Sequence, residues 1–398
     1  MKYKDEFKGK ESTFWLENCP GTNFPKLEDG LNVDVAILGG GIVGVTTAIL
    51  LKESGFKVAL IEADRIVKDV TVGTTAKISA APNMIYERLI ANLGRNKAQK
   101  FADASMKSLE KISEIVKEKN IECDFHRLPL YIYSESYENE EKIKLEYDSA
   151  KELGLPVSYT ENVPLPFKTG PAIKYDNQAQ FHPRKYLLAL SKDLDGEGSY
   201  VFEQTRVITV KDGEKKEIIT DQGFLTADKV VVATHTPVYD PDSIKEHLHP
   251  ARSYVIALYS NEDFPDGMFI DIDPMHTYRA APTKKGNLII VAGEHSPVDV
   301  DDRNVYYSRL EDYARNHLNV KSIEYHWTSK DAATDDGLPI IGETSPKGIY
   351  IATGLGFWGM TNGTTAAMVN ADIISGKENE FVDLFNPLRF KKNYNKIQ

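Results

Sequence analysis

The stretch Val33-Asp-Val-Ala-Ile-Leu-Gly39-Gly40-Gly41-Ile42-Val43-Gly44, followed by Val58-Ala-Leu-Ile-Glu62, decides the fold. Strand, glycine turn, helix start, second strand and terminal acid follow one another, which is the order of a nucleotide-binding βαβ unit. Gly39 allows the sharp turn, Gly41 lets a pyrophosphate approach the backbone, and Gly44 lets the helix pack on the strand. Glu62 comes 18 residues after Gly44, where a carboxylate can accept hydrogen bonds from both ribose hydroxyls of an adenosine.

Two other interpretations of this stretch are a plain strand–turn–helix and a membrane span. Residues 33–51 carry only one charge over 19 residues, close to the length that spans a bilayer. Three consecutive glycines and a helix stop at Ser54-Gly55 argue against the span. The helix that begins at Ile42 and Val43 points its N–H groups and the positive end of its dipole at the expected phosphates. The sequence therefore favours a dinucleotide site.

The composition is that of an ordinary globular protein. The chain has 398 residues, of which 41% are hydrophobic and 27% charged, so it is long enough for two domains. A net charge of -11 argues against a general nucleic-acid or anionic-membrane surface. We expect small-molecule chemistry in the cytoplasm, with no nucleic acid partner and no transmembrane segment. The sequence is silent on oligomeric state.

The N-terminal residues and the two cysteines bear on targeting and on the redox environment. Residues 1–10 have positive charges but no apolar core after them, so we expect no secretory signal. Cys19 and Cys123 lack the spacing of zinc or iron–sulfur ligands, and we interpret both as structural thiols in a reducing compartment.

The order of predicted elements indicates two interleaved domains in an α/β fold. Buried strands of the parallel type recur near residues 35, 60, 231 and 351, separated by α+β material with alternating strands. Apolar and polar residues alternate over 200–210 and 217–225, which predicts a hairpin. Residues 301–318 are predicted to form a helix. We assign 1–120, 179–243 and 327–398 to a Rossmann-like nucleotide-binding domain, and 121–178 and 244–326 to an α+β substrate domain built on an antiparallel sheet.

The segment Gly354-Leu-Gly356-Phe357-Trp358-Gly359-Met360-Thr361-Asn362-Gly363 helps to decide between NAD and FAD. Three glycines and two aromatic residues lead from a buried strand directly into a helix N-terminus. Such a terminus suits the anion that develops at N1 and the C2 carbonyl of an isoalloxazine ring on reduction. The alternative is an ordinary helix entry with Thr361 or Asn362 as its cap and packed aromatics.

With these residues in view, the chain resembles the FAD-dependent oxidoreductases of the D-amino-acid oxidase and glycine oxidase superfamily. The branch it is most similar to often carries a C-terminal Rieske domain and includes relatives such as gamma-glutamylputrescine oxidoreductase. The resemblance covers nearly the whole length in the family's order, and its motifs are the first glycine motif, Gly73-Thr-Thr-Ala-Lys77, Gln178–Tyr186, Val231–His235, Asp336–Gly342 and Gly354–Gly363.

The resemblance implies where FAD would be held. The ADP half would lie on the glycine motif and Glu62, with Val207 contacting adenine through its backbone. The pyrophosphate, ribityl chain and ring would lie along Thr74, Thr75, Ala76, Lys77, Ala233, Thr234, Gly354, Gly356, Phe357, Trp358, Gly359, Met360 and Thr361. Because no cysteine follows Cys123 for a thioether bond, we expect the FAD to be non-covalent.

The resemblance implies that a hydride passes from a carbon that bears an amine to the flavin. Oxygen or another acceptor would then reoxidise the flavin. On that basis the candidate catalytic residues are Arg279, Tyr254, Tyr278, His182 and Trp358, with His295 on the same strand-rich segment. A guanidinium such as that of Arg279 can clamp a substrate carboxylate with two parallel bonds.

Two alternatives to this prediction stay open. The enzyme could instead be a flavoprotein dehydrogenase of a 2-hydroxy acid, or the chain could be a flavin-binding electron-transfer subunit without its own substrate. A Rieske centre needs two cysteines and two histidines, so we expect none here; whether such a module was lost or lies beyond these residues stays open. His247-Leu-His249 and Asp299–Asp302 lack a completing group, and we expect no metal site.

Overall fold

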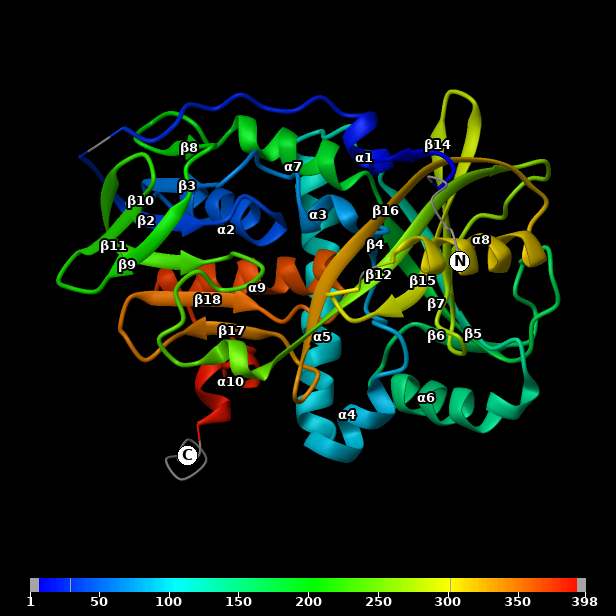
Figure 1. Cartoon of the computed structure of the whole chain (residues 1–398). Coiled ribbons are helices and arrows are strands. Elements are labelled where there is room, and N and C mark those ends of the chain that lie inside the picture. The colour runs from blue at the N-terminus through cyan, green and yellow to red at the C-terminus, as the bar shows by residue number, and fades with distance from the viewer. Residues whose placement is uncertain (1–6, 29, 301, 392–398) are drawn as a thin grey trace.

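The computed structural model describes residues 7–28, 30–300 and 302–391, which form two β-sheets side by side (Figure 1). The first sheet has eight strands in the order β17-β18-β11-β2-β3-β8, with β10 paired to β11 and β9 to β10. Its strands are β2 (Leu31–Leu38), β3 (Val58–Ile61), β8 (Tyr200–Phe202), β9 (Val207–Lys211), β10 (Lys216–Thr220), β11 (Phe224–Val232), β17 (Ile340–Glu343) and β18 (Ile349–Thr353).

The centre of this sheet is parallel, as the apolar runs predict. β8, β3, β2, β11 and β18 all run in the same direction, and Val35 pairs with Val58 on one side and Lys229 on the other. Residues 35–38 are fully buried because helices cover the sheet. The covering helices include α2 (Ile42–Glu53), α7 (Pro183–Lys192) and α9 (Gly359–Ile374).

One predicted element of this sheet is wrong in detail. The run 200–210 is not one strand of a hairpin: β8 pairs with β3, and the hairpin is formed by β9 and β10. Between β8 and β9, the main-chain N–H groups of Gln204 and Thr205 donate to the carbonyls of Asp64 and Glu62, and Gln204 has φ +49°. These local bonds turn the chain away from the sheet edge.

The second sheet has ten strands and is mostly antiparallel. Its order is β1-β16-β12-β15-β14-β13-β5-β7-β4, with β6 paired to β7. Its strands are β1 (Lys10–Glu11), β4 (Lys77–Ile78), β5 (His126–Tyr133), β6 (Val157–Thr160), β7 (Ala172–Gln180), β12 (Leu248–Ser260), β13 (Met268–Asp271), β14 (Thr277–Thr283), β15 (Gly286–Ser296) and β16 (Val320–Thr334). The predicted α/β class with an antiparallel second sheet is confirmed.

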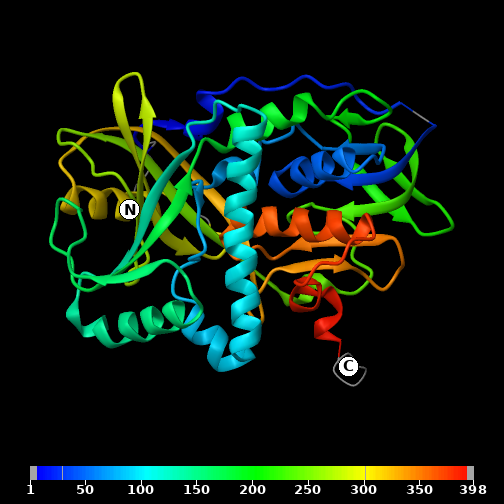
Figure 2. The same ribbon diagram turned by 180° about the vertical axis from the view of Figure 1, so that it is seen from behind.

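A long helix, α5 (Arg95–Glu118), runs between the two halves, as the view from behind shows most clearly (Figure 2). It buries Phe101, Leu109 and Ile112 along one face, the pattern expected of an amphipathic helix. Helices α6 (Glu140–Glu152) and α8 (Asn304–His317) flank the second sheet. The remaining helices are α1 (Phe14–Glu17), α3 (Val70–Gly73), α4 (Tyr86–Leu93) and α10 (Val382–Phe385), with short 3-10 turns at Tyr137–Asn139, Ile244–His247 and Pro387–Phe390.

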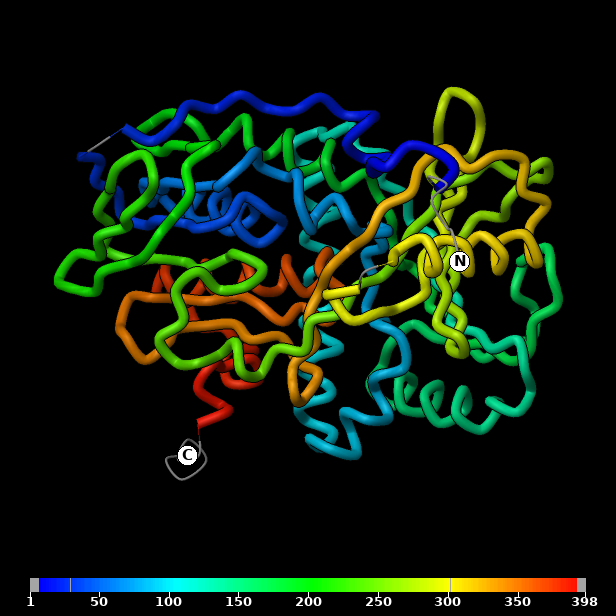
Figure 3. Tube along the Cα trace, in the orientation of Figure 1, coloured from blue at the N-terminus to red at the C-terminus, as the bar shows by residue number. Residues whose placement is uncertain are grey.

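The chain crosses between the halves several times (Figure 3). β1 and β4, which lie within the proposed first segment 1–120, belong to the second sheet. β16 extends through the proposed boundary at residue 327. The domain boundaries therefore stay a proposal, whereas the sheet assignments are given by the strand pairing. In the part of the chain that the structure describes, no helix is long and apolar enough to cross a membrane.

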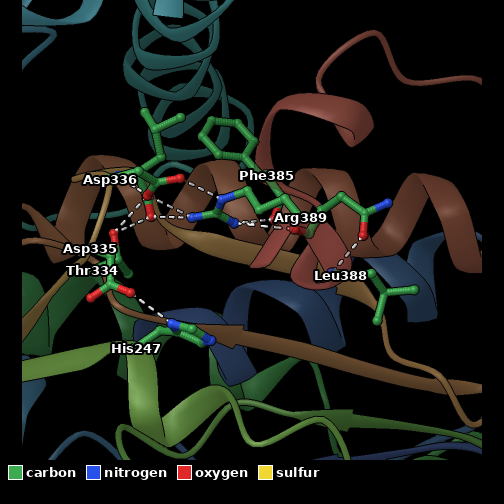
Figure 4. A network of polar contacts seen from close by, with 9 residues as sticks. His247, Thr334, Asp335, Asp336, Phe385, Leu388 and Arg389 are labelled. Atoms are coloured by element: carbon green, nitrogen blue, oxygen red, sulfur yellow. Dashed lines mark hydrogen bonds and ion pairs between the residues drawn. The ribbon is translucent and has the colours of Figure 1, made fainter. Parts of the chain in front are cut away.

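The 3-10 turn Pro387–Phe390 is tied to the turn between β16 and β17 (Figure 4). The Arg389 guanidinium contacts both carboxylate oxygens of Asp336, Nε to Oδ2 at 2.7 Å and an Nη to Oδ1 at 3.0 Å, and donates to the carbonyl of Leu338 at 2.8 Å. Because a bidentate arginine–carboxylate pair fixes orientation as well as distance, this contact fastens residues 387–390 beside β17.

Candidate functional site

A cavity of about 580 Å³ lies where the two sheets meet. One end is lined by the glycine turn after β2 and by the end of β3. The other end is lined by residues of β12, β14, β15 and β16 and by the turn that precedes α9. The site is thus built from segments at the beginning, middle and end of the chain.

The glycine turn leaves no room for side chains. Gly39 has φ +110°, and a Cβ there would lie 2.7 Å from the carbonyl oxygen of Ala233. A Cβ on Gly44 would lie 1.8 Å from the carbonyl oxygen of Gly39. The close approach of α2 to β2 therefore requires Gly44, although Gly44 itself does not line the cavity.

The N-terminus of α2 faces the cavity. Gly41 is its N-cap and supplies no side-chain hydrogen bond, and Gly41, Ile42 and Val43 all line the cavity wall. Among the described residues, the N–H of Ile42 is the one in this first turn that has a side-chain acceptor, the hydroxyl of Thr71 at 3.1 Å. The first turn can accordingly receive an anion with backbone N–H groups and the positive end of the helix dipole.

Glu62 ends β3 on the same wall. Its Oε2 accepts a hydrogen bond from the N–H of Gly40 at 2.7 Å, and its Oε1 accepts from the N–H of Asp64 at 2.9 Å. The carboxylate is held at the cavity edge with acceptor capacity left for a ligand hydroxyl. Two neighbouring cations are already paired, Arg65 with Glu203 and Lys68 with Asp64.

The segment Gly73–Ser79, called the central segment below, lines part of the cavity, and all three tryptophans of the chain hold it. The indole N–H groups donate to its carbonyl oxygens, Trp327 to Gly73 at 2.9 Å, Trp15 to Thr74 at 2.8 Å and Trp358 to Ser79 at 2.9 Å. Of the predicted residues here, Thr74, Thr75 and Lys77 line the cavity; Ala76, with φ +59°, does not.

Arg279 does not lie on the cavity wall. It is 1% exposed, and its guanidinium donates to the carbonyls of Thr75, Ala76 and Phe181 at 3.0–3.2 Å. Burial lowers the pKa of this side chain to about 9. Its donors are therefore occupied by backbone, so the geometry gives Arg279 the task of shaping residues 75–76 in place of the carboxylate clamp expected from the sequence.

Lys77 does reach the cavity and is nearly enclosed. It is 5% exposed, and its Nζ bonds the hydroxyl of Thr75 at 3.0 Å. No carboxylate of the described residues lies within 4.0 Å of Nζ. Burial, and then the neighbouring charge of Arg279, hold the pKa of Lys77 well below its usual range. A buried lysine of this kind stabilises an anion placed in the cavity.

The turn before α9 forms another part of the cavity wall. Gly354, Gly356 and Phe357 have φ between +62° and +64°, and Trp358 is the N-cap of α9 without a side-chain cap bond. Gly354, Phe357, Trp358, Gly359 and Met360 line the cavity; Gly356 and Thr361 do not. Thr361 exchanges hydrogen bonds with the backbone of Ser79 at 3.0 and 3.1 Å, so it joins α9 to the central segment and does not cap the helix.

The remaining predicted residues divide into two groups. Ala233, Thr234 and His295 line the cavity. Val207 does not, and its neighbour Arg206 does. Tyr254 and Tyr278 are 0% exposed and lie off the cavity wall: Tyr254 stacks on Tyr306, and Tyr278 packs against Phe167.

His182 also lies off the cavity. Its Nδ1 accepts the N–H of Lys185 at 3.3 Å and so caps α7, and its ring packs edge-on against Trp15. Burial lowers its pKa to about 3. The neutral ring is thus placed as a structural cap, and neither His182 nor the two tyrosines are brought to the cavity.

Sequence reasoning missed several residues on the wall, chiefly Asp331, His235, Ser253 and Thr277. Asp331 is 8% exposed, and its Oδ1 accepts the N–H of Ala332 at 2.8 Å. A signal was present, because Asp331 is a charged residue in a strand just before the Asp336–Gly342 motif.

No group of metal-ligating side chains is found among the residues that the structure describes. His247 and His249 both contact the exposed carboxylate of Asp335, at 2.7 and 2.5 Å, and the first of these contacts is drawn in Figure 4.

The chain matches the FAD dependent oxidoreductase family, DAO, over residues 34–373. It belongs to this family. The match includes the glycine turn, Glu62, the central segment and the start of α9, so the whole cavity lies inside it. The protein is therefore an FAD-dependent oxidoreductase of the amine and amino-acid oxidase type.

Similar proteins and structures agree with this assignment. The DAO chain is 33% identical over 387 residues to the "Putative Rieske 2Fe-2S iron-sulfur protein YhfW" of Bacillus subtilis, covering 96% of this chain and 76% of that protein. It is 22% identical to the gamma-glutamylputrescine oxidoreductase of Escherichia coli, covering 90% and 87%. Glycine oxidase from Geobacillus kaustophilus has a similar fold, with TM-score 0.76, 17% identity and coverage of 90% and 99%.

FAD fits the residues of the cavity. An ADP group needs a glycine turn at a helix N-terminus and an acid at the end of the second strand, which Gly39–Gly44 and Glu62 provide. A ring that becomes anionic needs positive potential, which Lys77 and the start of α9 provide. The residues that meet the two requirements line one cavity.

Proposed function

We propose that this protein oxidises the CH–NH group of a small amine or amino acid, using FAD held without a covalent bond. The observation that carries the proposal is the cavity itself, which has an ADP-type cradle at one end and, at the other, a chamber walled by the second sheet. When bound, FAD supplies the two-electron acceptor for a hydride from the substrate carbon.

The protein's share is position and charge. In the proposal, Glu62 binds the adenosine ribose, and the first turn of α2 binds the pyrophosphate. Thr74, Thr75 and Lys77 border the flavin on one side, and Gly354 and Phe357–Met360 border its pyrimidine edge on the other. Because the central segment is fixed by three indoles and Arg279, these contacts are set before a ligand arrives.

The chamber beyond the flavin is apolar with a few polar groups. Val255, Ile270 and Ala292 supply the apolar wall, and Thr277 and His295 supply polar atoms. Burial lowers the pKa of His295, so its ring is neutral near neutral pH and can take a proton from an amine substrate. An apolar chamber also keeps water away from the carbon that loses hydride.

Names of similar proteins agree with a nitrogen-bearing donor. Gamma-glutamylputrescine oxidoreductase is named for an amine substrate, and L-proline dehydrogenase from P. horikoshii, a structure with TM-score 0.73 and 19% identity, for an amino acid. Oxygen or a separate carrier would reoxidise the flavin. The acidic surface and free thiols of Cys19 and Cys123 suit a small-molecule enzyme of the cytoplasm.

The test is anaerobic bleaching of the bound flavin by a panel of N-methyl amino acids, D-amino acids, gamma-glutamyl amines and 2-hydroxy acids. The proposal expects at least one amine or amino acid to bleach the flavin, and the hydroxy acids to leave it oxidised. Bleaching by hydroxy acids alone would make the protein a hydroxy-acid dehydrogenase. A flavin that stays oxidised with every compound would favour an electron-transfer subunit.

A further inference from the structure

A buried carboxylate without a cationic partner lies on the wall of the cavity. Asp331 is 8% exposed and lines the cavity from β16. Among the described residues, no nitrogen of a lysine, arginine or histidine side chain lies within 4.0 Å of its carboxylate oxygens. Buried carboxylates are normally paired, so this one requires an explanation.

The hydrogen bonds that Asp331 does make are few and neutral. Its carboxylate accepts from the main-chain N–H groups of Ala332 and Phe357. An ionised carboxylate offers about four acceptor sites, so acceptor capacity is left over. Burial raises the pKa of Asp331, and the neighbouring His235 opposes this rise. The carboxylate is thus short of positive charge.

The position of Asp331 places this need in the chamber and not at the adenosine end. Its strand neighbour Ser329 pairs with Ser253 of β12, and both line the cavity. Phe357, which donates to Asp331, contacts the ring of His295 edge-on at 5.9 Å. Near Glu62, Arg65 and Lys68 are paired with Glu203 and Asp64, and Lys77 makes no ion pair with Asp331.

We propose that Asp331 binds the ammonium group of the substrate and makes the enzyme select cationic amines over anionic 2-hydroxy acids. This inference rests on the proposed function and names its substrate class. An ammonium group would supply the missing charge and up to three donors, and would keep the carboxylate ionised. An anionic substrate would meet like charge in a region shielded from water, which disfavours its binding.

The test compares three probes of the same shape that cannot lose hydride: tert-butylammonium, tert-butanol and pivalate. Each is titrated by calorimetry into the FAD-loaded protein. The proposal expects tert-butylammonium to bind at least about tenfold more tightly than tert-butanol, and pivalate to bind more weakly than both. A wild-type protein that binds pivalate best, or that does not distinguish the three, overturns it without any variant.

The substitution Asp331→Asn then assigns the preference to this residue. Asparagine keeps an acceptor for Ala332 and Phe357 but removes the charge. The affinity for tert-butylammonium should fall about tenfold, to that of tert-butanol, while the affinity for tert-butanol stays the same. If all three probes weaken equally, Asp331 only shapes the wall and the proposal is wrong. Asp335→Asn, which removes an exposed carboxylate four residues later, should change none of the affinities.

Failure of this inference differs from failure of the proposed function. If amines bleach the flavin but Asp331→Asn leaves tert-butylammonium binding unchanged, the function stands and the assignment of Asp331 falls. If no amine bleaches the flavin, the function falls, and the probe affinities still decide whether Asp331 forms a cation site.

Discussion

The indole Nε1 of Trp358 donates a hydrogen bond to the carbonyl oxygen of Ser79 at 2.9 Å and joins the start of α9 to a segment 279 residues earlier in the chain. Thr361 adds two more bonds to Ser79. The central segment and the α9 N-terminus therefore form one wall, and a change in either is transmitted to the other.

Arg279 supports this wall from behind, so its loss should affect folding and FAD before substrate choice. Arg279→Met leaves the buried carbonyls of Thr75, Ala76 and Phe181 without their donor. We expect unfolding free energy to fall by about 2–4 kcal/mol, measured with urea, together with the FAD content. Arg95→Met, at an exposed ion pair with Glu152, should cost about 1 kcal/mol or less. A normal stability with a raised KM only for carboxylate substrates would restore the clamp interpretation.

Gly44→Ala tests the packing of α2 on β2. Because the new Cβ would lie 1.8 Å from the carbonyl oxygen of Gly39, the helix has to move away from the phosphate site. The affinity for FAD should fall at least about tenfold, a loss of about 1.4 kcal/mol or more, and the FAD retained per chain after reconstitution should fall with it. Gly213→Ala, in the exposed β9–β10 hairpin, should retain full FAD content. Equal FAD content in both variants would contradict the account.

Lys77 should destabilise the FAD-free protein, because an unpaired cation is buried there. The pKa of Lys77 is lower in the folded than in the unfolded chain. The loss of folding free energy is therefore full at a pH below the pKa of the folded state, and it fades as pH rises toward 10.5. We expect Lys77→Met to stabilise the FAD-free protein by about 1 kcal/mol at pH 7 and by less at pH 10.

The same substitution should weaken binding of sulfite to the flavin and lower the flavin reduction potential, because both the adduct and the reduced ring are anionic. Lys285→Met, at an exposed side chain, serves as the control in urea unfolding and in the redox titration. An unchanged reduction potential in Lys77→Met would show that Lys77 does not act on the flavin.

Asp271 gives stability a pH dependence of its own. Burial, aided by the charge of Glu135, raises its pKa from 3.8 to about 7. The contribution of the protonated Asp271 carboxyl to folding stability is full at a pH below 3.8, the pKa in the unfolded chain, and it is lost as pH rises through 7. Asp271→Asn should therefore gain stability relative to wild type between pH 4 and pH 7, with an upper limit of about 4 kcal/mol. Thermal unfolding at both pH values measures this gain. Asp266→Asn, at an exposed site, should show no such trend.

The FAD half of the site could be predicted from the sequence because its residues are contiguous. A glycine turn, a helix start and an acid within 30 residues place themselves through local geometry. The turn before α9 is equally local. These segments show in the sequence the features that the structure then brings to one cavity.

The chamber could not be predicted in the same way, because its walls depend on strand faces and on pairing between distant segments. Ser253 and Val255 line the cavity, so the pleat turns Tyr254 to the other side of β12. In the same way, Thr277 of β14 lines the cavity and Tyr278 points to the other side of the strand. Arg279 shares a face with Thr277 but is covered by Trp15, whose ring lies 5.3 Å from the guanidinium carbon. Asp331 reaches the chamber only through the pairing of β16 with β12.

We propose that one FAD molecule occupies the cavity between the two sheets. The most direct measurement is the visible absorption spectrum of the protein after reconstitution with FAD and removal of excess cofactor, followed by acid denaturation to test release. We expect one FAD per chain, released intact by denaturation. A protein that stays colourless after reconstitution would contradict it.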